Sequence, residues 1–224
     1  MKRYGIIGGT FDPIHYAHLY IAYEAKKQLN LDKVIFMPAG KQPLKTENKV
    51  TDSNLRYEMV KMAIEEFEEF SISSYEIEKE GLSFTYETLE YIKENTIENI
   101  IEDDKKFGES KNNKTENKEL FFITGADCLM SIEKWRGVSE IFSLCTLVVF
   151  VRGGFNKENL IDQKSRIEEK YNGRIIVLDL KELEISSTDI RNRIKENKRI
   201  DFFVPSKVVN FIYENKLYIS KTHK

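Results

Sequence analysis

The chain has few of the features that mark secreted or membrane-spanning proteins. Its 224 residues include two cysteines, Cys128 and Cys145, which are widely spaced and lie beside apolar segments. We therefore expect reduced thiols rather than a disulfide. The sequence shows no signal peptide and no apolar run long enough to cross a bilayer, so it predicts a cytoplasmic protein without a membrane partner.

The chain also lacks an excess of basic charge. Its formal net charge is -2, and lysine and arginine are interspersed with acidic residues. This composition argues against a nucleic-acid partner, because nucleic-acid-binding domains usually carry a basic patch or stripe. It leaves the oligomeric state open, a homo-oligomer included.

Histidine is scarce, and its placement is informative. Of three histidines, His15 and His18 fall in one motif, GGTFDPIHYAHL, and His223 lies in the polar tail. The motif follows an apolar run and opens into a helical pattern, so it predicts a strand, a glycine turn and a helix start, where α/β proteins bind phosphates. Two histidines three residues apart face the same way on a helix and can bind phosphate oxygens. The turn has neither the G-x-G-x-x-G pattern nor the Gly-Lys-Ser/Thr ending of commoner phosphate loops.

A second motif, ISSTDIR, spans Ile185 to Arg191 near the other end of the chain. Its hydroxyl residues are good helix N-caps, and capping without a ligand would explain them if they stood alone. Together with an arginine one turn into the helix, they also supply donors, the helix dipole and a guanidinium for phosphate oxygens. We therefore predict that the two motifs form two halves of one nucleotide-phosphate site.

Strand-like and helical segments alternate along the chain, which predicts an α/β fold: a Rossmann-like, doubly wound parallel sheet with helices on both faces. We expect one domain over residues 1–224, with a small helical part at residues 185–220. The segment 102–119 is almost free of apolar residues and is predicted to be a mobile polar insertion loop. The expected strands are Lys2 to Ile7, Lys33 to Pro38, Phe70 to Ser73, Leu120 to Thr124, Thr146 to Val151 and Arg174 to Leu180, and helices are expected at Ser53 to Phe67, Glu87 to Lys93, Asn156 to Tyr171 and after Pro205.

The first motif resembles the (T/H)-x-G-H signature of the nucleotidyltransferase superfamily, and the second resembles the I-S-S-T-x-I-R signature of bacterial nicotinate-nucleotide adenylyltransferases. The similarity extends from Lys2 to about Ser220 through four further segments, FMPAGKQPLK, SFTYETL, FFITGADCLMSIEKW and the strand end at Val148 to Gly153. Two positions depart from the pattern. Ala17 replaces the signature glycine, which we expect to tighten the fit slightly, and Leu44 stands where a histidine is common, so any role of that histidine is absent.

The resemblance implies adenylyl transfer from ATP to nicotinate mononucleotide, giving nicotinate adenine dinucleotide and pyrophosphate. It implies catalytic roles for His18, His15 and Arg191. We expect Mg²⁺ to be carried mainly by ATP and waters, since the sequence offers no compact carboxylate cluster as a dedicated metal site. The residues that it assigns to ATP are Gly8, Gly9, Thr10, Phe11, His15, His18, Gly125, Asp127, Ser186, Ser187, Thr188 and Arg191. Those that it assigns to the nicotinate nucleotide are Lys45, Thr85, Trp135 and Arg152.

Several of these residues have a structural alternative. Thr85 could be an N-cap, and Trp135 could be a core residue or a partly buried helix end. Asp127 follows a strand at its carboxyl end, which favours a ribose-binding carboxylate over a turn residue. Two other functions also stay open: the same chemistry with another acceptor, such as a pantetheine phosphate or a cytidylyl-transfer substrate, and a nucleotide-binding regulator without catalysis. The SFTYETL and GADCLMSIEKW segments distinguish the acceptors.

Overall fold

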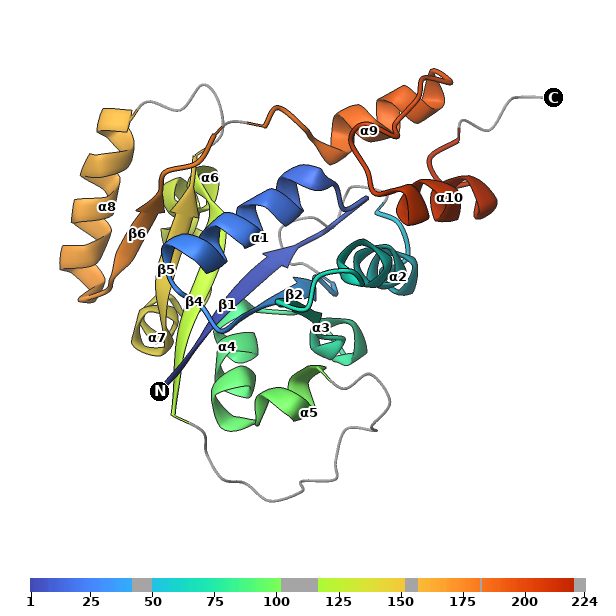
Figure 1. Ribbon diagram of the computed structural model, residues 1–224. Helices are drawn as coiled ribbons and strands as arrows, with labels where there is room; N and C mark the ends of the chain where they lie inside the picture. The colour runs from blue at the N-terminus through green and yellow to red at the C-terminus, as the bar shows by residue number, and fades with distance from the viewer. Residues whose placement is uncertain (42–49, 102–116, 152–156, 182, 220–224) are drawn as a thin grey trace.

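Strands and helices alternate in the computed structural model, which describes residues 1–41, 50–101, 117–151, 157–181 and 183–219 (Figure 1). The strands are β1 (Lys2–Gly9), β2 (Lys33–Pro38), β3 (Phe70–Ile72), β4 (Lys118–Gly125), β5 (Cys145–Phe150) and β6 (Ile175–Leu178). The helices are α1 (Tyr16–Gln28), α2 (Ser53–Ile64), α3 (Tyr75–Glu78), α4 (Thr85–Glu94), α5 (Ile97–Ile101), α6 (Ala126–Ser131), the 3-10 turn η1 (Ile132–Lys134), α7 (Val138–Leu144), α8 (Lys157–Tyr171), α9 (Ser187–Lys195) and α10 (Ser206–Glu214).

The six strands form one sheet in the order β3-β2-β1-β4-β5-β6, and each neighbouring pair is parallel. The strand order therefore reverses between β1 and β4. In open parallel sheets, ligands bind outside the carboxyl ends of the strands at such a reversal. The predicted doubly wound sheet is confirmed, and both glycine-containing segments of the predicted site, the ends of β1 and β4, lie at this point.

Successive residues of the central strands pack into two cores, one on each face of the sheet. Ile7 and Phe36 contribute to the core under α1, α2, α9 and α10. Ile6 and Ile35 contribute to the opposite core, under α4 to α8. Because both faces are covered by helices, the middle parts of β1, β2, β4 and β5 are apolar at successive positions instead of alternating with polar residues.

The predicted strands all form, with ends that differ from the expected ones by at most two residues, and the difference at β4 is the informative one. This strand begins at Lys118, so Lys118 and Glu119, which were expected to belong to the polar loop, are part of the sheet. The side chain of Lys118 is buried, and its ammonium group donates hydrogen bonds to the carbonyl oxygens of Ile92, at 2.8 Å, and Asn95. A lysine that bonds the last carbonyls of a helix can be buried, and its sequence neighbours do not reveal this. The preceding part of the loop lies outside the described residues.

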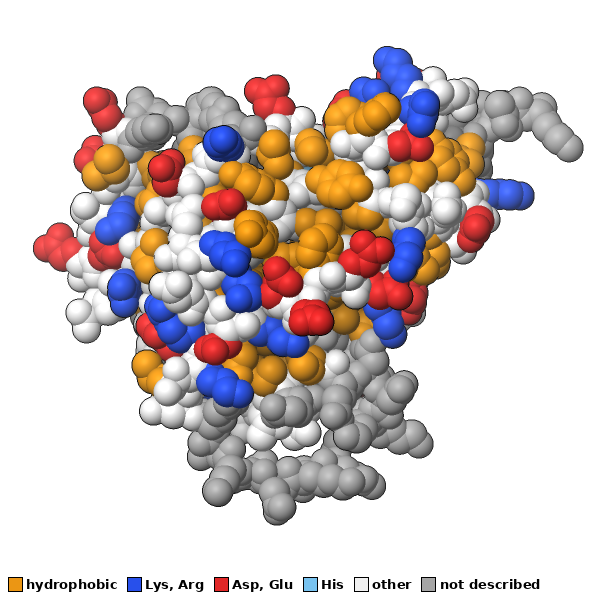
Figure 2. Space-filling model, in the orientation of Figure 1, with side chains coloured by type: hydrophobic (Ala, Val, Ile, Leu, Met, Phe, Trp, Pro, Cys, Tyr) orange, Lys and Arg blue, Asp and Glu red, His pale blue; other side chains and the backbone are white. Residues whose placement is uncertain are grey.

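The surface in Figure 2 carries acidic and basic side chains side by side rather than in separate patches. Cys128 and Cys145 are free, as expected, and burial raises the pKa of the Cys145 thiol to about 12. Among the helices that the structure describes, none has the length and apolarity needed to span a bilayer.

Candidate active site

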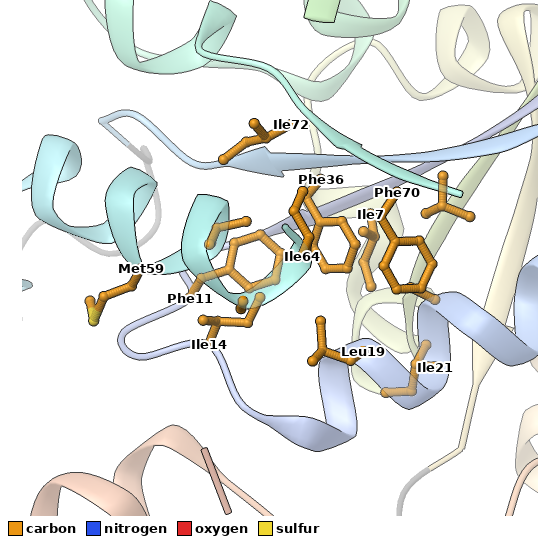
Figure 3. Close-up of a cluster of buried hydrophobic side chains, with 14 of the residues drawn as sticks. Ile7, Phe11, Ile14, Leu19, Ile21, Phe36, Met59, Ile64, Phe70 and Ile72 are labelled. Carbon is orange, nitrogen blue, oxygen red and sulfur yellow. The ribbon is translucent and has the colours of Figure 1, made fainter. Parts of the chain in front are cut away.

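The loop between β1 and α1 is shaped by a side chain that points inward. Phe11 has a backbone φ of 49° and its side chain is buried against Phe36, with the ring centroids 5.8 Å apart (Figure 3). A Cβ atom at Gly9 would lie 2.9 Å from the Phe11 ring, so this ring requires the glycine. The glycine thus makes room for this ring, and its place beside a ligand stays a prediction from the sequence. The aromatic side chain of Phe11 faces the core, and only its backbone could line a phosphate site.

The two histidines lie together at the start of α1. His15 is the N-cap and His18 is the third residue of the helix. The backbone N–H of His15 donates to Nδ1 of His18 at 3.3 Å, and the two rings stack. Because Nδ1 accepts this bond, the proton of a neutral His18 ring resides on Nε2. His18 thus presents an N–H donor of the kind that a phosphate oxygen accepts.

The first N–H groups of α1 are less open than the sequence indicated. The N–H of Tyr16 donates to the carbonyl of Phe203 at 3.0 Å, and that of His18 donates to the carbonyl of His15 at 2.9 Å. The methyl group of Ala17 is buried between these positions. Since two of the helix-start donors have protein partners, the imidazole groups are the better candidates for an anion at this helix.

The second motif contacts the first, as the paired motifs predicted (Figure 1). Ser187 at the start of α9 donates its hydroxyl hydrogen to the carbonyl of Pro13 at 2.8 Å, across 174 positions of the chain. Arg191 donates through Nη1 to the carbonyl of Asp12 at 2.6 Å and through Nη2 to the hydroxyl of Thr188 at 3.2 Å. The helical part at the C-terminus is therefore attached to the loop that carries the histidines.

These contacts change what each α9 residue can offer a ligand. Ser186 is the N-cap, with its side-chain oxygen accepting from the N–H of Asp189 at 3.1 Å. The hydroxyl hydrogen of Ser187 is used by Pro13, so that side chain fixes the loop rather than donating to an anion. Arg191 uses two of its five N–H donors in the contacts above, which leaves up to three for a phosphate.

Arg56 of α2 is a structural residue that the sequence analysis missed. Its guanidinium donates to the carbonyls of Thr51, Thr10 and Ala39 at 2.9, 2.7 and 2.7 Å, which joins the β1 and β2 ends to the start of α2. Burial lowers the pKa of Arg56, while the charge of Asp12 acts in the opposite direction. The sequence feature that could have revealed its role is an arginine at a position of the α2 pattern that is otherwise apolar.

The end of β4 carries the residues expected on the adenosine side. Gly125 is the N-cap of α6, and Asp127 lies exposed in its first turn. A Cβ atom at Gly125 would lie 2.7 Å from Oδ1 of Asp127, so the glycine leaves room for the carboxylate beside the strand end. β4 pairs directly with β1, which places this carboxylate at the strand edge that carries the histidine loop.

Two of the residues expected to hold the acceptor are described: Thr85 at the start of α4 and Trp135 directly after η1. Thr85 is the first residue of α4, and the N-cap is the extended Phe84, so the N-cap alternative for Thr85 is wrong. Trp135 ends η1, half-buried, with its ring edge-on to Phe122 at 6.2 Å. The two segments are in contact, since the Phe84 ring lies 5.0 Å from the Arg136 guanidinium. Lys45, Leu44 and Arg152 lie outside the described residues.

Glu76 of α3 is a carboxyl group held next to this region. It accepts hydrogen bonds from the hydroxyl of Thr88, at 2.8 Å, and from the backbone N–H of Gly40. Burial raises the pKa of Glu76 above its usual value, and these hydrogen bonds oppose the shift. A Cβ atom at Gly40 would collide with the backbone of Glu76, so α3 packs directly on the segment after β2.

Within the described ranges, the histidine, cysteine and acidic side chains form no group of three or more that could hold a metal ion. The strand ends thus provide imidazoles, a guanidinium and one exposed carboxylate, a set suited to binding and orienting a nucleotide polyphosphate.

Comparison with known proteins gives a consistent picture. The cytidylyltransferase-like family matches residues 6–193. A protein of Clostridium beijerinckii named probable nicotinate-nucleotide adenylyltransferase is 68% identical over 97% of this chain and 100% of its own length. A protein of Clostridium botulinum (strain Eklund 17B) with the same name is 63% identical over 97% of this chain and 98% of its own length.

Solved structures support the fold. The Plasmodium falciparum nicotinic acid mononucleotide adenylyltransferase complexed with NaAD superposes with a TM-score of 0.71, covering 97% of this chain and 98% of that one. The same enzyme complexed with APC gives a TM-score of 0.69 with the same coverage. At 17% sequence identity, these likenesses concern the arrangement of strands and helices.

Proposed function

The chain belongs to the cytidylyltransferase-like family, and from this premise we propose that it is a nicotinate-nucleotide adenylyltransferase. It transfers the adenylyl group of ATP to nicotinate mononucleotide in the synthesis of NAD. Relatives that bear this name align over nearly the whole chain, including the segments on both sides of the strand reversal. The observation that carries the proposal is the direct contact of the two motifs, Arg191 on Asp12 and Ser187 on Pro13, at the carboxyl end of β1.

The reaction needs no protein nucleophile. A phosphate oxygen of nicotinate mononucleotide attacks the α-phosphorus of ATP in line, and a new P–O bond forms. The bond from that phosphorus to the bridging oxygen breaks, and its electron pair leaves with pyrophosphate. The work of the protein is to hold two anions close together and to stabilise the charge that moves to the leaving group.

On the ATP side, His18 donates from Nε2 to a phosphate oxygen, and His15 supports it through the stacked ring. Arg191 holds the leaving pyrophosphate, and Thr188 and the backbone at the start of α9 add donors to it. The backbone of Gly8, Gly9, Thr10 and Phe11 lines the α-phosphate. Asp127 accepts from the ribose hydroxyls, and Gly125 lets the nucleotide approach the end of β4.

On the acceptor side, Thr85 and the backbone around Trp135 hold the nicotinate ring and its carboxylate. Lys45 and Arg152 add positive charge that attracts the anionic nicotinate nucleotide, as the family resemblance implies. Mg²⁺ enters as part of the substrate MgATP, since the described residues form no group of three or more histidine, cysteine or acidic side chains that could hold a metal. A cytoplasmic location stays a prediction from the sequence.

The direct test is to incubate the purified chain with MgATP and a panel of acceptors and to measure pyrophosphate and the nucleotide product. We expect nicotinate adenine dinucleotide and stoichiometric pyrophosphate with nicotinate mononucleotide. Faster turnover with pantetheine phosphate, or with CTP and a phosphorylated alcohol, would assign the same chemistry to another acceptor. Nucleotide binding without release of pyrophosphate from any pair would identify a regulator.

A further inference from the structure

The C-terminal segment returns to the nucleotide loop through one tyrosine. The hydroxyl of Tyr218 donates to Oδ1 of Asp12 at 2.7 Å, although the two residues are 206 positions apart. The other carboxylate oxygen of Asp12 accepts from the backbone N–H of Thr51 at 3.4 Å. Asp12 is buried, and its own carbonyl accepts from Arg191. One residue of the loop therefore connects α1, α2, α9 and the chain beyond α10.

The backbone bends sharply to bring the tyrosine there. The chain turns out of α10 at Lys216, with φ of 51°, and Tyr218 itself has φ of 62°. The N–H of Leu217 donates back to the carbonyl of Ile212 at 2.9 Å, and Leu217 packs on the core under α10. A bulky residue with positive φ is rare and is retained only where the surroundings hold it. Here the hydrogen bond to Asp12 holds it.

The tyrosine donates under all ordinary conditions. Burial, followed by the negative charge of Asp12, raises the pKa of Tyr218 well above its usual value. The group therefore keeps its proton, and the buried carboxylate of Asp12 keeps a neutral donor in a half-buried hydrogen bond. A hydrogen bond to a charged acceptor is stronger than one between neutral groups.

We propose that Tyr218 is a positioning residue for the ATP site, which acts through Asp12. With the carboxylate fixed by Tyr218 and Thr51, the adjacent carbonyls of Asp12 and Pro13 are fixed too. They are the acceptors that orient Arg191 and Ser187. Without the tyrosine hydroxyl, ATP must order the loop as it binds, and the free energy of this ordering reduces its affinity. The inference rests on the proposed function for the identity of the nucleotide.

The test compares Tyr218→Phe, which keeps the ring, with Tyr213→Phe, a matched control at an exposed position of α10. We expect Tyr218→Phe to raise the Kd and the KM for MgATP about tenfold. This factor corresponds to the lower end of the free energy lost with a hydrogen bond to a charged group. The KM for nicotinate mononucleotide should stay within about twofold of the wild-type value. Tyr213→Phe should behave as the wild type. Combining Tyr218→Phe with Asp12→Ala should weaken ATP binding no more than Asp12→Ala alone, since the tyrosine acts through that side chain.

Unchanged ATP affinity in Tyr218→Phe would overturn the proposal. An equal rise of both KM values would also overturn it, because a merely structural role loosens both halves of the site. Calorimetry with ATP alone tests the positioning role of Tyr218 separately from the proposed transfer to nicotinate mononucleotide. If the wild type binds ATP and Tyr218→Phe binds it tenfold more weakly while neither makes the dinucleotide, the positioning role stands and the proposed acceptor is wrong.

Discussion

The imidazole rings of His15 and His18 stack with their centroids 3.7 Å apart and their planes 23° apart. The contact follows from the sequence, since an N-cap and the third helical residue lie on the same side of the first turn. It combines with the hydrogen bond from the His15 backbone to Nδ1 of His18, which fixes the ring and its tautomer. His18 is therefore held in place before any nucleotide binds, as electrostatic stabilisation of a transition state requires.

Replacing His18 with alanine should lower turnover much more than it weakens ATP binding. Removing one preorganised donor to developing charge reduces the rate by roughly 10²–10³, or about 2.7–4 kcal/mol. Steady-state kinetics with both substrates and calorimetry with ATP measure the two effects. The variant His223→Ala changes a histidine outside the two motifs and serves as the control. Turnover close to that of the wild type in His18→Ala would remove this residue from the mechanism.

Replacing Arg56 with methionine should destabilise the whole domain. The side chain is buried, and its loss leaves the carbonyls of Thr51, Thr10 and Ala39 without this partner. The bond to Ala39 is buried, whereas those to Thr51 and Thr10 are half-buried. A buried acceptor left unsatisfied costs about 1–3 kcal/mol, so the free energy of unfolding should fall by at least about that amount. Urea denaturation measures it, with Lys61→Met on the exposed side of α2 as the control. A loss no larger than in the control would contradict the bracing role.

The acceptor site should prefer nicotinate mononucleotide to nicotinamide mononucleotide. A site whose N–H groups point at both carboxylate oxygens leaves the NH₂ of the amide facing donors, a mismatch of about 1–3 kcal/mol or more. This corresponds to a ratio of at least about tenfold in kcat/KM, which competition between the two nucleotides measures. Thr85→Ala should lower the ratio of kcat/KM for nicotinate mononucleotide to that for nicotinamide mononucleotide. The control Glu90→Ala, at an exposed position further along α4, should leave this ratio unchanged. Equal kcat/KM values would refute the selectivity and leave adenylyl transfer intact.

Glu76 should make stability fall as pH rises. Its pKa is raised in the folded chain by burial, from an ordinary value of 4.5. Below pH 4.5 the carboxyl group is protonated in both the folded and the unfolded state. Between 4.5 and the raised pKa the folded state binds more protons than the unfolded state, so the free energy of unfolding decreases with pH. Above the raised pKa the carboxyl group is ionised in both states, so Glu76 no longer changes the free energy of unfolding as the pH rises further.

Comparison with Glu76→Gln isolates this group, because glutamine does not titrate. The free energy of unfolding of the wild type, minus that of the variant, should decline as the pH rises above 4.5 and should level off only above the raised pKa. Denaturant titrations at several pH values give the difference. Glu80→Gln, at an exposed position just after α3, provides the matched control. A difference that increases with pH would show that the folded state favours the ionised carboxyl.

Local pattern was sufficient to predict much of this protein. The apolar runs predicted all the strands, because a strand covered on both faces must be apolar at successive positions such as Ile6 and Ile7. The glycine turn and hydroxyl cluster predicted two helix starts, because capping depends on residues that are close together in the sequence. The short helices α3, α5, α6 and α7 were not predicted, since four to seven residues show too little of the helical period.

The sequence by itself determined the succession of strand, glycine turn and helix before α1 and the helix start at α9. It also determined the pairing of His15 with His18 and the family resemblance. Only the tertiary structure decided which donors are already used: the Ser187 hydroxyl is bonded to Pro13, and the Phe11 ring is turned into the core. It alone brought Tyr218 to Asp12 and Arg56 to three carbonyls. The physical reason is that periodicity and capping report interactions within a few residues, whereas these contacts join segments that meet only when the sheet is complete.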